Sequence, residues 1–158
     1  MLKHIKRTAA LLWAKKAVKD AQQFKDNAIE DQEKLLLSMV DTAKKTLFGR
    51  VHQFGDIQSI EDYQERVPVN DYEGFSPYID KIKHGDKHIL WPDQPEYFAK
   101  TSGTTSGTKY IPISKEGMPF QIKGAQSALF HYIAQKNNAN FVSGKMIFLQ
   151  GSPLLEEK

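Results

Sequence analysis

The sequence has no cysteine among its 158 residues, which excludes disulfide bonds, thiolate zinc sites and a cysteine nucleophile. It also has no long uncharged apolar run, so we expect no membrane span. The mean hydropathy of −0.53 indicates a soluble chain, and the hydrophobic content of 40% is enough for a core. The length suits one domain, and these features together predict a globular protein of the cytoplasm.

A strong excess of one charge is missing too, because the net charge is only +3. The charge is uneven: residues 1–50 hold 11 Lys or Arg against 6 Asp or Glu, whereas residues 51–158 hold 11 against 13. The basic residues are interleaved with acidic ones and have no aromatic or Arg-rich pattern of a nucleic-acid binder. We therefore expect neither a nucleic acid nor a membrane as partner.

The first fifty residues read as helices. Basic residues precede a short apolar run at 9–14, but Lys15 and Lys16 end it without a cleavage site, so a mature amphipathic helix is expected instead of a signal peptide. A second helix is expected from Asn27, an N-cap with Glu30 three residues on. The expected apolar stripes are Ala10, Trp13, Ala17, Ala21 and Phe24 in the first helix, and Ile29, Leu36, Val40, Ala43, Leu47 and Val51 in the second.

The middle of the chain carries clear start and stop signals. Ser59 opens a short helix through a capping-box variant, and residues 67–69, Val-Pro-Val, must be extended because the residue before proline disfavours the α region. Asn70 or Asp71 begins a further helix that Gly85 ends. Pro77 should limit that helix to two short pieces or lie in a first turn.

Later elements alternate between strands and a helix. A turn at 91–95 leads into a strand at 97–101, and a second strand is expected at 110–113. Ser114 should cap a helix over 115–137, and residues 145–150 form an apolar strand. The expected buried stripe of that helix is Met118, Ile122, Ala125, Leu129 and Ile133.

His84 and His88 lie four residues apart, a spacing that places two side chains on one face of a helix. Gly85 interrupts the helix between them. We therefore expect surface histidines and assign no metal-binding residue.

One loop holds most of the chemistry. Residues 101–109 read Thr-Ser-Gly-Thr-Thr-Ser-Gly-Thr-Lys between two β-prone runs. Glycines let the backbone approach a ligand closely, successive N–H groups can converge on an anion, and Lys109 adds a compact positive charge. The pattern predicts a phosphate-binding loop, whose candidate residues are Ser102, Gly103, Thr104, Thr105, Ser106, Gly107 and Lys109.

The loop is not a Walker P-loop, which requires Lys and then Ser or Thr directly after its second glycine. Here Thr108 stands between Gly107 and Lys109, Tyr110 follows the lysine, and a strand follows instead of a helix. A flexible Ser/Thr/Gly surface hairpin is the competing interpretation from composition. On that interpretation Thr101 and Thr108 are simply strand-end residues.

Residues 101–109 resemble the ATP phosphate-binding motif of the adenylate-forming superfamily. Ser106 before Gly107 is typical of one branch, the Gretchen Hagen acyl-acid amido synthetases, the auxin-responsive family. Residues 66–72, Arg-Val-Pro-Val-Asn-Asp-Tyr, with Pro77–Ile79 and Gly85-Asp86, resemble that family upstream of the loop, and residues 145–153 resemble it downstream. The resemblance covers the chain from about Phe54 onward.

The resemblance implies an α/β fold: a helical lead-in at 1–55, then the start of a large α/β domain at 56–158. The helix after the loop would pack against the sheet behind the nucleotide site. Several hundred further residues would hold the acid pocket, the adenine and amine sites and a separate C-terminal domain, so we expect an N-terminal fragment.

The resemblance also implies a ligase that uses ATP and Mg²⁺ to join a carboxylic acid to an amine such as an amino acid. In such an enzyme the loop holds the β- and γ-phosphates. We expect no catalytic residue in this stretch, and no catalysis and at best weak ATP binding by the chain alone.

Two alternatives remain open. One is a standalone nucleotide- or anion-binding module, and the other is a helical interaction protein with an inert hairpin. We also expect exposed apolar edges and hence poor solubility or oligomers.

Overall fold

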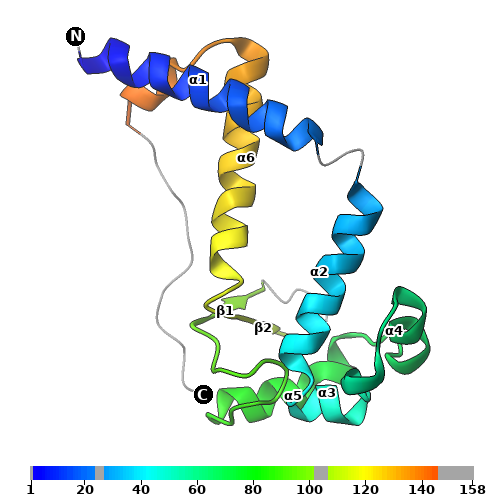
Figure 1. Ribbon diagram of the computed structural model, residues 1–158. Helices are drawn as coiled ribbons and strands as arrows, with labels where there is room; N and C mark the ends of the chain where they lie inside the picture. Colours follow the sequence, from blue (N-terminus) through cyan, green and yellow to red (C-terminus); the bar gives the residue numbers. More distant parts are fainter. Residues whose placement is uncertain (1, 24–26, 102–106, 146–158) are drawn as a thin grey trace. The chain divides into compact units, whose positions relative to one another are not determined.

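The computed structural model describes residues 2–23, 27–101 and 107–145. Its elements, drawn in Figure 1, are α1 (Leu2–Gln23), α2 (Ala28–Ala43), α3 (Leu47–Val51), the 3-10 helix η1 (Phe54–Asp56), α4 (Ile60–Arg66), α5 (Tyr72–Lys83), β1 (Tyr97–Lys100), β2 (Tyr110–Ile113), α6 (Met118–Lys136) and the 3-10 helix η2 (Asn140–Ser143). The chain divides into two compact units. We call Phe24–Lys123 the middle unit, and Met1–Gln23 with Gly124–Lys158 the terminal unit.

The core of the middle unit is built around the ring of Phe48. Its centroid lies 5.8 Å from that of Phe54, 5.7 Å from Phe75 and 5.4 Å from Tyr78. Such offset and edge-to-face pairs add to the stabilisation that comes from burial alone. The buried members of this core are Val40, Ala43, Phe48, Phe54 and Ile57.

The second helix starts where the sequence predicts, since Asn27 is the N-cap of α2, although its side chain makes no capping hydrogen bond. The prediction that the helix continues to Val51 is wrong. The chain turns at Thr46, whose buried hydroxyl donates to Ala43 O at 2.7 Å and accepts from Gly49 N at 3.0 Å. Gly49 is required there, because an added Cβ would lie 2.2 Å from the Ala43 carbonyl oxygen.

The capping signal at Ser59 is confirmed. Its hydroxyl accepts from Asp62 N at 3.1 Å, and the Asp62 carboxylate accepts from Gln58 N at 2.9 Å. These bonds satisfy N–H groups that have no partner within the first turn of a helix. Val67 beyond the helix is extended, with φ −111° and ψ 99°, as expected before proline.

Helix α5 begins after Asp71, whose side chain accepts from Gly74 N at 3.0 Å. It ends as predicted at Gly85, with φ +96°, and two bonds close this end, from Gly85 N to Ile82 O and from Asp86 N to Lys81 O. The expected interruption at Pro77 is wrong, because α5 is continuous. Proline removes one internal hydrogen bond, and the burial of Ile79 and Ile82 beyond it favours one continuous helix.

Strands β1 and β2 pair antiparallel, with Tyr97 opposite Ile113 and Lys100 opposite Tyr110. They form a two-stranded sheet, and the described ranges contain no further strand. The predicted strand at 145–150 lies outside these ranges except for Lys145. The strand–loop–strand arrangement is therefore confirmed, while the large α/β domain stays a prediction.

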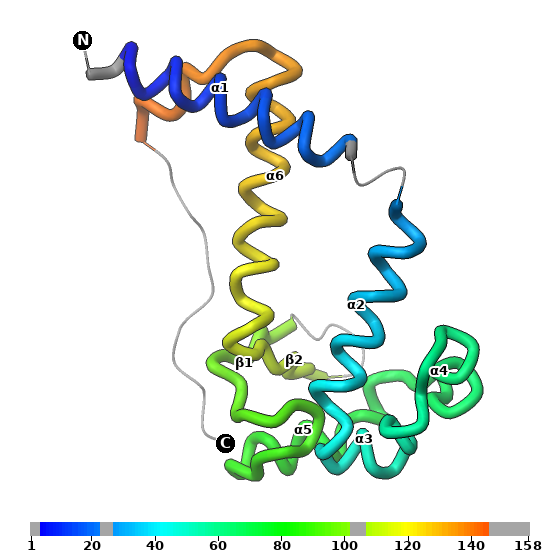
Figure 2. Tube along the Cα trace, in the orientation of Figure 1, coloured from blue at the N-terminus to red at the C-terminus, as the bar shows by residue number. Residues whose placement is uncertain are grey.

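The terminal unit is held by a small core between α1, the second half of α6 and the segment that follows. Figure 2 shows α1 crossing α6 near the end of α6. The buried residues are Ala14, Ile133 and Ala139, and Arg7 Nε donates to Ser143 Oγ at 3.2 Å. The predicted stripe is wrong at Trp13, which is 69% exposed. Ala14 is buried instead, and the partly buried Ala10 and Leu11 pack against the same core.

The third long helix starts later than expected. Ser114 caps a turn by accepting from Gly117 N at 3.0 Å, and α6 follows from Met118 to Lys136. Of its predicted buried stripe only Ile133 is buried, while Ile122 and Leu129 are 51% and 44% exposed. Among the described residues, no helix is long and apolar enough to cross a membrane.

Candidate functional site

The two ends of the predicted phosphate-binding loop are tied together at its base. Thr101 N donates to Lys109 O at 3.0 Å, and Lys109 N donates to the Thr101 hydroxyl at 3.3 Å. Thr101 therefore closes the loop with its side chain as well as its backbone. This gives Thr101 a structural role.

Of the seven predicted loop residues, Gly107 and Lys109 lie in the described ranges. Ser102, Gly103, Thr104, Thr105 and Ser106 lie outside them, and their phosphate-binding role stays a prediction. Gly107 has φ +81° and open space where a Cβ would stand. This backbone region favours glycine over residues with a side chain, so the position has the conformation expected of a glycine in a tight turn.

The first residue of α5, Tyr72, holds the start of β2. Its hydroxyl accepts from Tyr110 N at 2.9 Å and lies 3.4 Å from Tyr110 O, to which it donates. The two residues are 38 positions apart in the sequence. Helix α5 is thus hydrogen-bonded to the first residue of β2, which directly follows Lys109.

Two lysines lie against aromatic rings at this end of the hairpin. The Lys109 Nζ is 5.3 Å from the centroid of the Tyr72 ring, and the Lys83 Nζ is 4.8 Å from that of Tyr110. Lys83 also contacts Asp80, with 3.5 Å between Nζ and Oδ1. The half-buried Lys109 therefore has a defined place beside the loop, which suits a cation that meets an anionic ligand.

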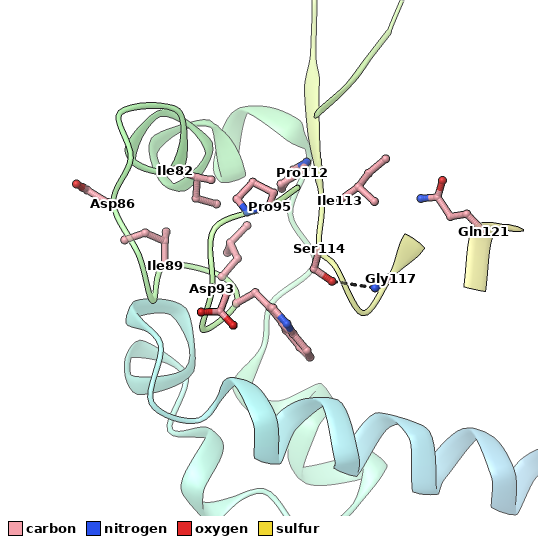
Figure 3. Close-up of a pocket in the computed structure, with 12 residues that line it drawn as sticks. Ile82, Asp86, Ile89, Asp93, Pro95, Pro112, Ile113, Ser114, Gly117 and Gln121 are labelled. Atoms are coloured by element: carbon pink, nitrogen blue, oxygen red, sulfur yellow. Dashed lines mark hydrogen bonds between the residues drawn. The ribbon is translucent and has the colours of Figure 1, made fainter. Parts of the chain in front are cut away.

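The opposite end of the hairpin borders a pocket of about 310 Å³ (Figure 3). Its lining is mostly apolar and consists of Ile82, Asp86, Ile89, Leu90, Trp91, Asp93, Pro95, Pro112, Ile113, Ser114, Gly117 and Gln121. The indole of Trp91 donates to Glu116 Oε2 at 3.0 Å. A hydrogen bond from its own backbone N–H, and then this indole bond, lower the pKa of Glu116.

The described ranges contain no group of three or more His, Cys, Asp or Glu side chains placed to hold a metal ion. His84 Nδ1 lies 2.7 Å from the Asp80 carbonyl oxygen within the last turn of α5. This local contact occupies the ring nitrogen within its own helix.

Residues 17–154 match the GH3 family N-terminal domain. The chain is also 28% identical over 123 residues to the indole-3-acetic acid-amido synthetase GH3.15 of Arabidopsis thaliana. That match covers 77% of this chain and 20% of the relative, so the chain spans about a fifth of the length of the curated protein it matches. The chain belongs to the GH3 family, and the resemblance seen in the loop and its flanks is confirmed.

The sequence predicts Gly107 and Lys109 as site residues, and their phosphate-binding role stays a prediction, whereas it gives no reason to single out Tyr72, which contacts Tyr110 and Lys109. The motif of residues 66–72 included Tyr72 only as a point of resemblance. The capping signal at Asp71 makes Tyr72 the first helical residue, yet a contact across 38 positions leaves no local pattern. The pairing of β2 with β1 determines where the backbone N–H and C=O groups of Tyr110 point, and this pairing is not visible in a local sequence pattern.

Proposed function

We propose that this chain supplies the triphosphate-binding part of an ATP-dependent acyl-acid amido synthetase. The observation that carries the proposal is the base of the loop, where Thr101 and Lys109 are bonded to each other beside the glycine at 107. Membership of the GH3 family supports the class of enzyme. The relative's printed name is that of an indole-3-acetic acid-amido synthetase, which fits a reaction that forms an amide of an acid.

The proposed reaction has two steps. A carboxylate oxygen attacks the α-phosphorus of ATP, the bond from that phosphorus to the bridging oxygen breaks, and pyrophosphate leaves with the electron pair. An amine nitrogen then attacks the acyl carbon and loses a proton, while AMP leaves with the electrons of the carbon–oxygen bond. The product is an amide.

The part of this chain in that reaction is binding and orientation. The Lys109 ammonium would face the β- and γ-phosphates and stabilise the charge that builds up on the leaving pyrophosphate. Backbone N–H groups of the loop would hold those phosphates in line for attack. No residue of the described ranges is assigned as an acid, a base or a nucleophile.

We assign no residue of this chain to Mg²⁺. The described residues contain no group of three or more His, Cys, Asp or Glu side chains placed to hold it, and the hydroxyls of Ser102, Thr104, Thr105 and Ser106 lie outside the described ranges. None of the roles assigned to this chain's residues involves the metal.

The first test is a titration of the chain with ATP that is monitored by NMR. The chemical-shift changes give the dissociation constant, even when it is in the millimolar range. We expect weak but saturable binding, and we expect Lys109→Ala to weaken it about five- to tenfold, because about 1 to 1.4 kcal/mol of charge-assisted contact is lost. The matched control is Lys19→Ala, which removes the same charge from an exposed position of α1.

Equal ATP affinity in the parent chain and in Lys109→Ala contradicts the assignment and favours an inert hairpin. Binding of tripolyphosphate as tight as that of ATP indicates a general polyphosphate site. We expect no exchange of ATP with labelled pyrophosphate by this chain, and measured exchange would show that the chain alone performs the first step.

A further inference from the structure

We propose that Tyr72 is a positioning residue for Lys109: its hydroxyl fixes the backbone after the lysine, and its ring holds the ammonium in place for a polyphosphate. The inference rests on the proposed function, because it concerns the same site. It adds a residue from a different element, helix α5, to Lys109.

The backbone N–H and C=O groups of Tyr110 point away from β1 and toward Tyr72. In an antiparallel pair, opposed residues alternate between pairs that are hydrogen-bonded to each other and pairs that are not. Thr101 and Lys109 are bonded across the pair, so the next pair, Lys100 with Tyr110, turns its N–H and C=O groups outward. At Tyr110 both outward groups meet one hydroxyl, that of Tyr72.

The side chain of Lys109 has a flexible stem, and ordering it on binding costs rotamer freedom. The Tyr72 ring, 5.3 Å from the ammonium, attracts the cation to its face. A ligand that meets Lys109 there loses less freedom on binding, since part of the ordering has already occurred.

The helix that carries Tyr72 is held at both ends and by buried side chains. Asp71 caps its start, Gly85 closes its end, and its buried residues Ile79 and Ile82 are 4% and 6% exposed. Tyr72 therefore stands at the fixed end of a well-anchored element. The lysine is held by its strand and by this ring together, so its place does not depend on the loop alone.

The test compares three variants by ATP titration of the chain. Tyr72→Phe keeps the ring and removes the hydroxyl, and we expect about threefold weaker binding for the loss of one backbone anchor. Tyr72→Leu removes both, and we expect about tenfold weaker binding. The matched control Tyr97→Phe, on the 55% exposed tyrosine of β1, should stay within twofold of the parent.

A double-mutant cycle separates positioning of Lys109 from support of the loop as such. In a chain that already carries Lys109→Ala, Tyr72→Leu should weaken ATP binding less than twofold further. A full tenfold loss in that background overturns the proposal, because Tyr72 would then act without the lysine. Affinity within twofold of the parent for Tyr72→Leu alone also overturns it.

A measurement without ligand completes the test. The ε-methylene protons of Lys109 should show an upfield ring-current shift that Tyr72→Phe keeps and Tyr72→Leu abolishes. An unchanged shift in a folded Tyr72→Leu variant overturns the contact. If the parent chain fails to bind ATP, the proposed function fails, and with it the ligand assigned to Tyr72; if the parent binds and the tyrosine variants match it, only the role of Tyr72 fails.

Discussion

The two units of the chain are stabilised in different ways. The middle unit packs several aromatic rings around Phe48, whereas the buried residues described in the terminal unit are two alanines and Ile133. Burial of a large apolar side chain contributes about 1.5–3 kcal/mol, against about 0.8 kcal/mol for one methylene. Stability is therefore concentrated in the unit that carries Tyr72, Lys109 and the hairpin.

The chain offers one reporter for each unit. Trp13 lies in the terminal unit, and Trp91 packs against the core of the middle unit. With 5-fluorotryptophan incorporated, fluorine NMR resolves the two residues, so denaturant unfolding of each unit can be followed in one sample.

The largest expected effect is that of Phe48→Ala. Removing a ring that is 8% exposed and contacts four other rings should lower the free energy of unfolding of the middle unit by about 3–5 kcal/mol. The Trp91 transition should move strongly while the Trp13 transition stays nearly unchanged. The control is Phe120→Ala, a 64% exposed ring, and an equal shift in both variants would contradict the central place of Phe48.

A smaller effect is expected for Ile133→Ala in the terminal unit. Ile133 is 2% exposed, and its truncation should cost about 2 kcal/mol, because the half-buried neighbours can partly close the space. With so small a core, this loss should abolish a cooperative Trp13 transition and leave that of Trp91 in place. Leu129→Ala on the same helix, 44% exposed, is the control. Simultaneous loss of both transitions would show that the two units unfold as one.

The smallest effect concerns pH and the capping box of α4. The backbone N–H of Gln58, the largest cause, and then the Ser59 hydroxyl hold the pKa of Asp62 below its ordinary value of 3.8. The carboxylate therefore stabilises the fold above the unfolded pKa, and this contribution is lost as pH falls through the lower folded pKa. Asp62→Asn should reduce the acid sensitivity of the Trp91 transition slightly, whereas Glu65→Gln in the same helix should not.

Local signals in the sequence predicted much of the fold. The side chains of Ser59 and Asp71 cap the first turns of two helices, and Gly85, which has no side chain, follows the end of the second. These three predictions are confirmed. The turn at Thr46 was missed, because its cause is a close approach between Gly49 and the Ala43 carbonyl that no periodicity shows. The stripe of α6 failed because the exposure of Ile122 and Leu129 depends on what packs there, which the helical period alone does not determine.

For the site, the sequence singled out Gly107 and Lys109, because glycine and lysine are the residue types that a phosphate-binding loop needs, and their role there stays a prediction. The contact of Tyr72 with Tyr110 arises from strand pairing and from a helix that starts 38 residues earlier, so it requires the structure.

The hydroxyl of Tyr72 has one more consequence, for association between chains. The outward edge of a strand is a template on which a foreign strand can add. At Tyr110 that edge is occupied by a side chain of the same molecule, which takes both backbone groups at once. A tyrosine at this position thus shields the first residue of β2 from edge-to-edge pairing with another chain.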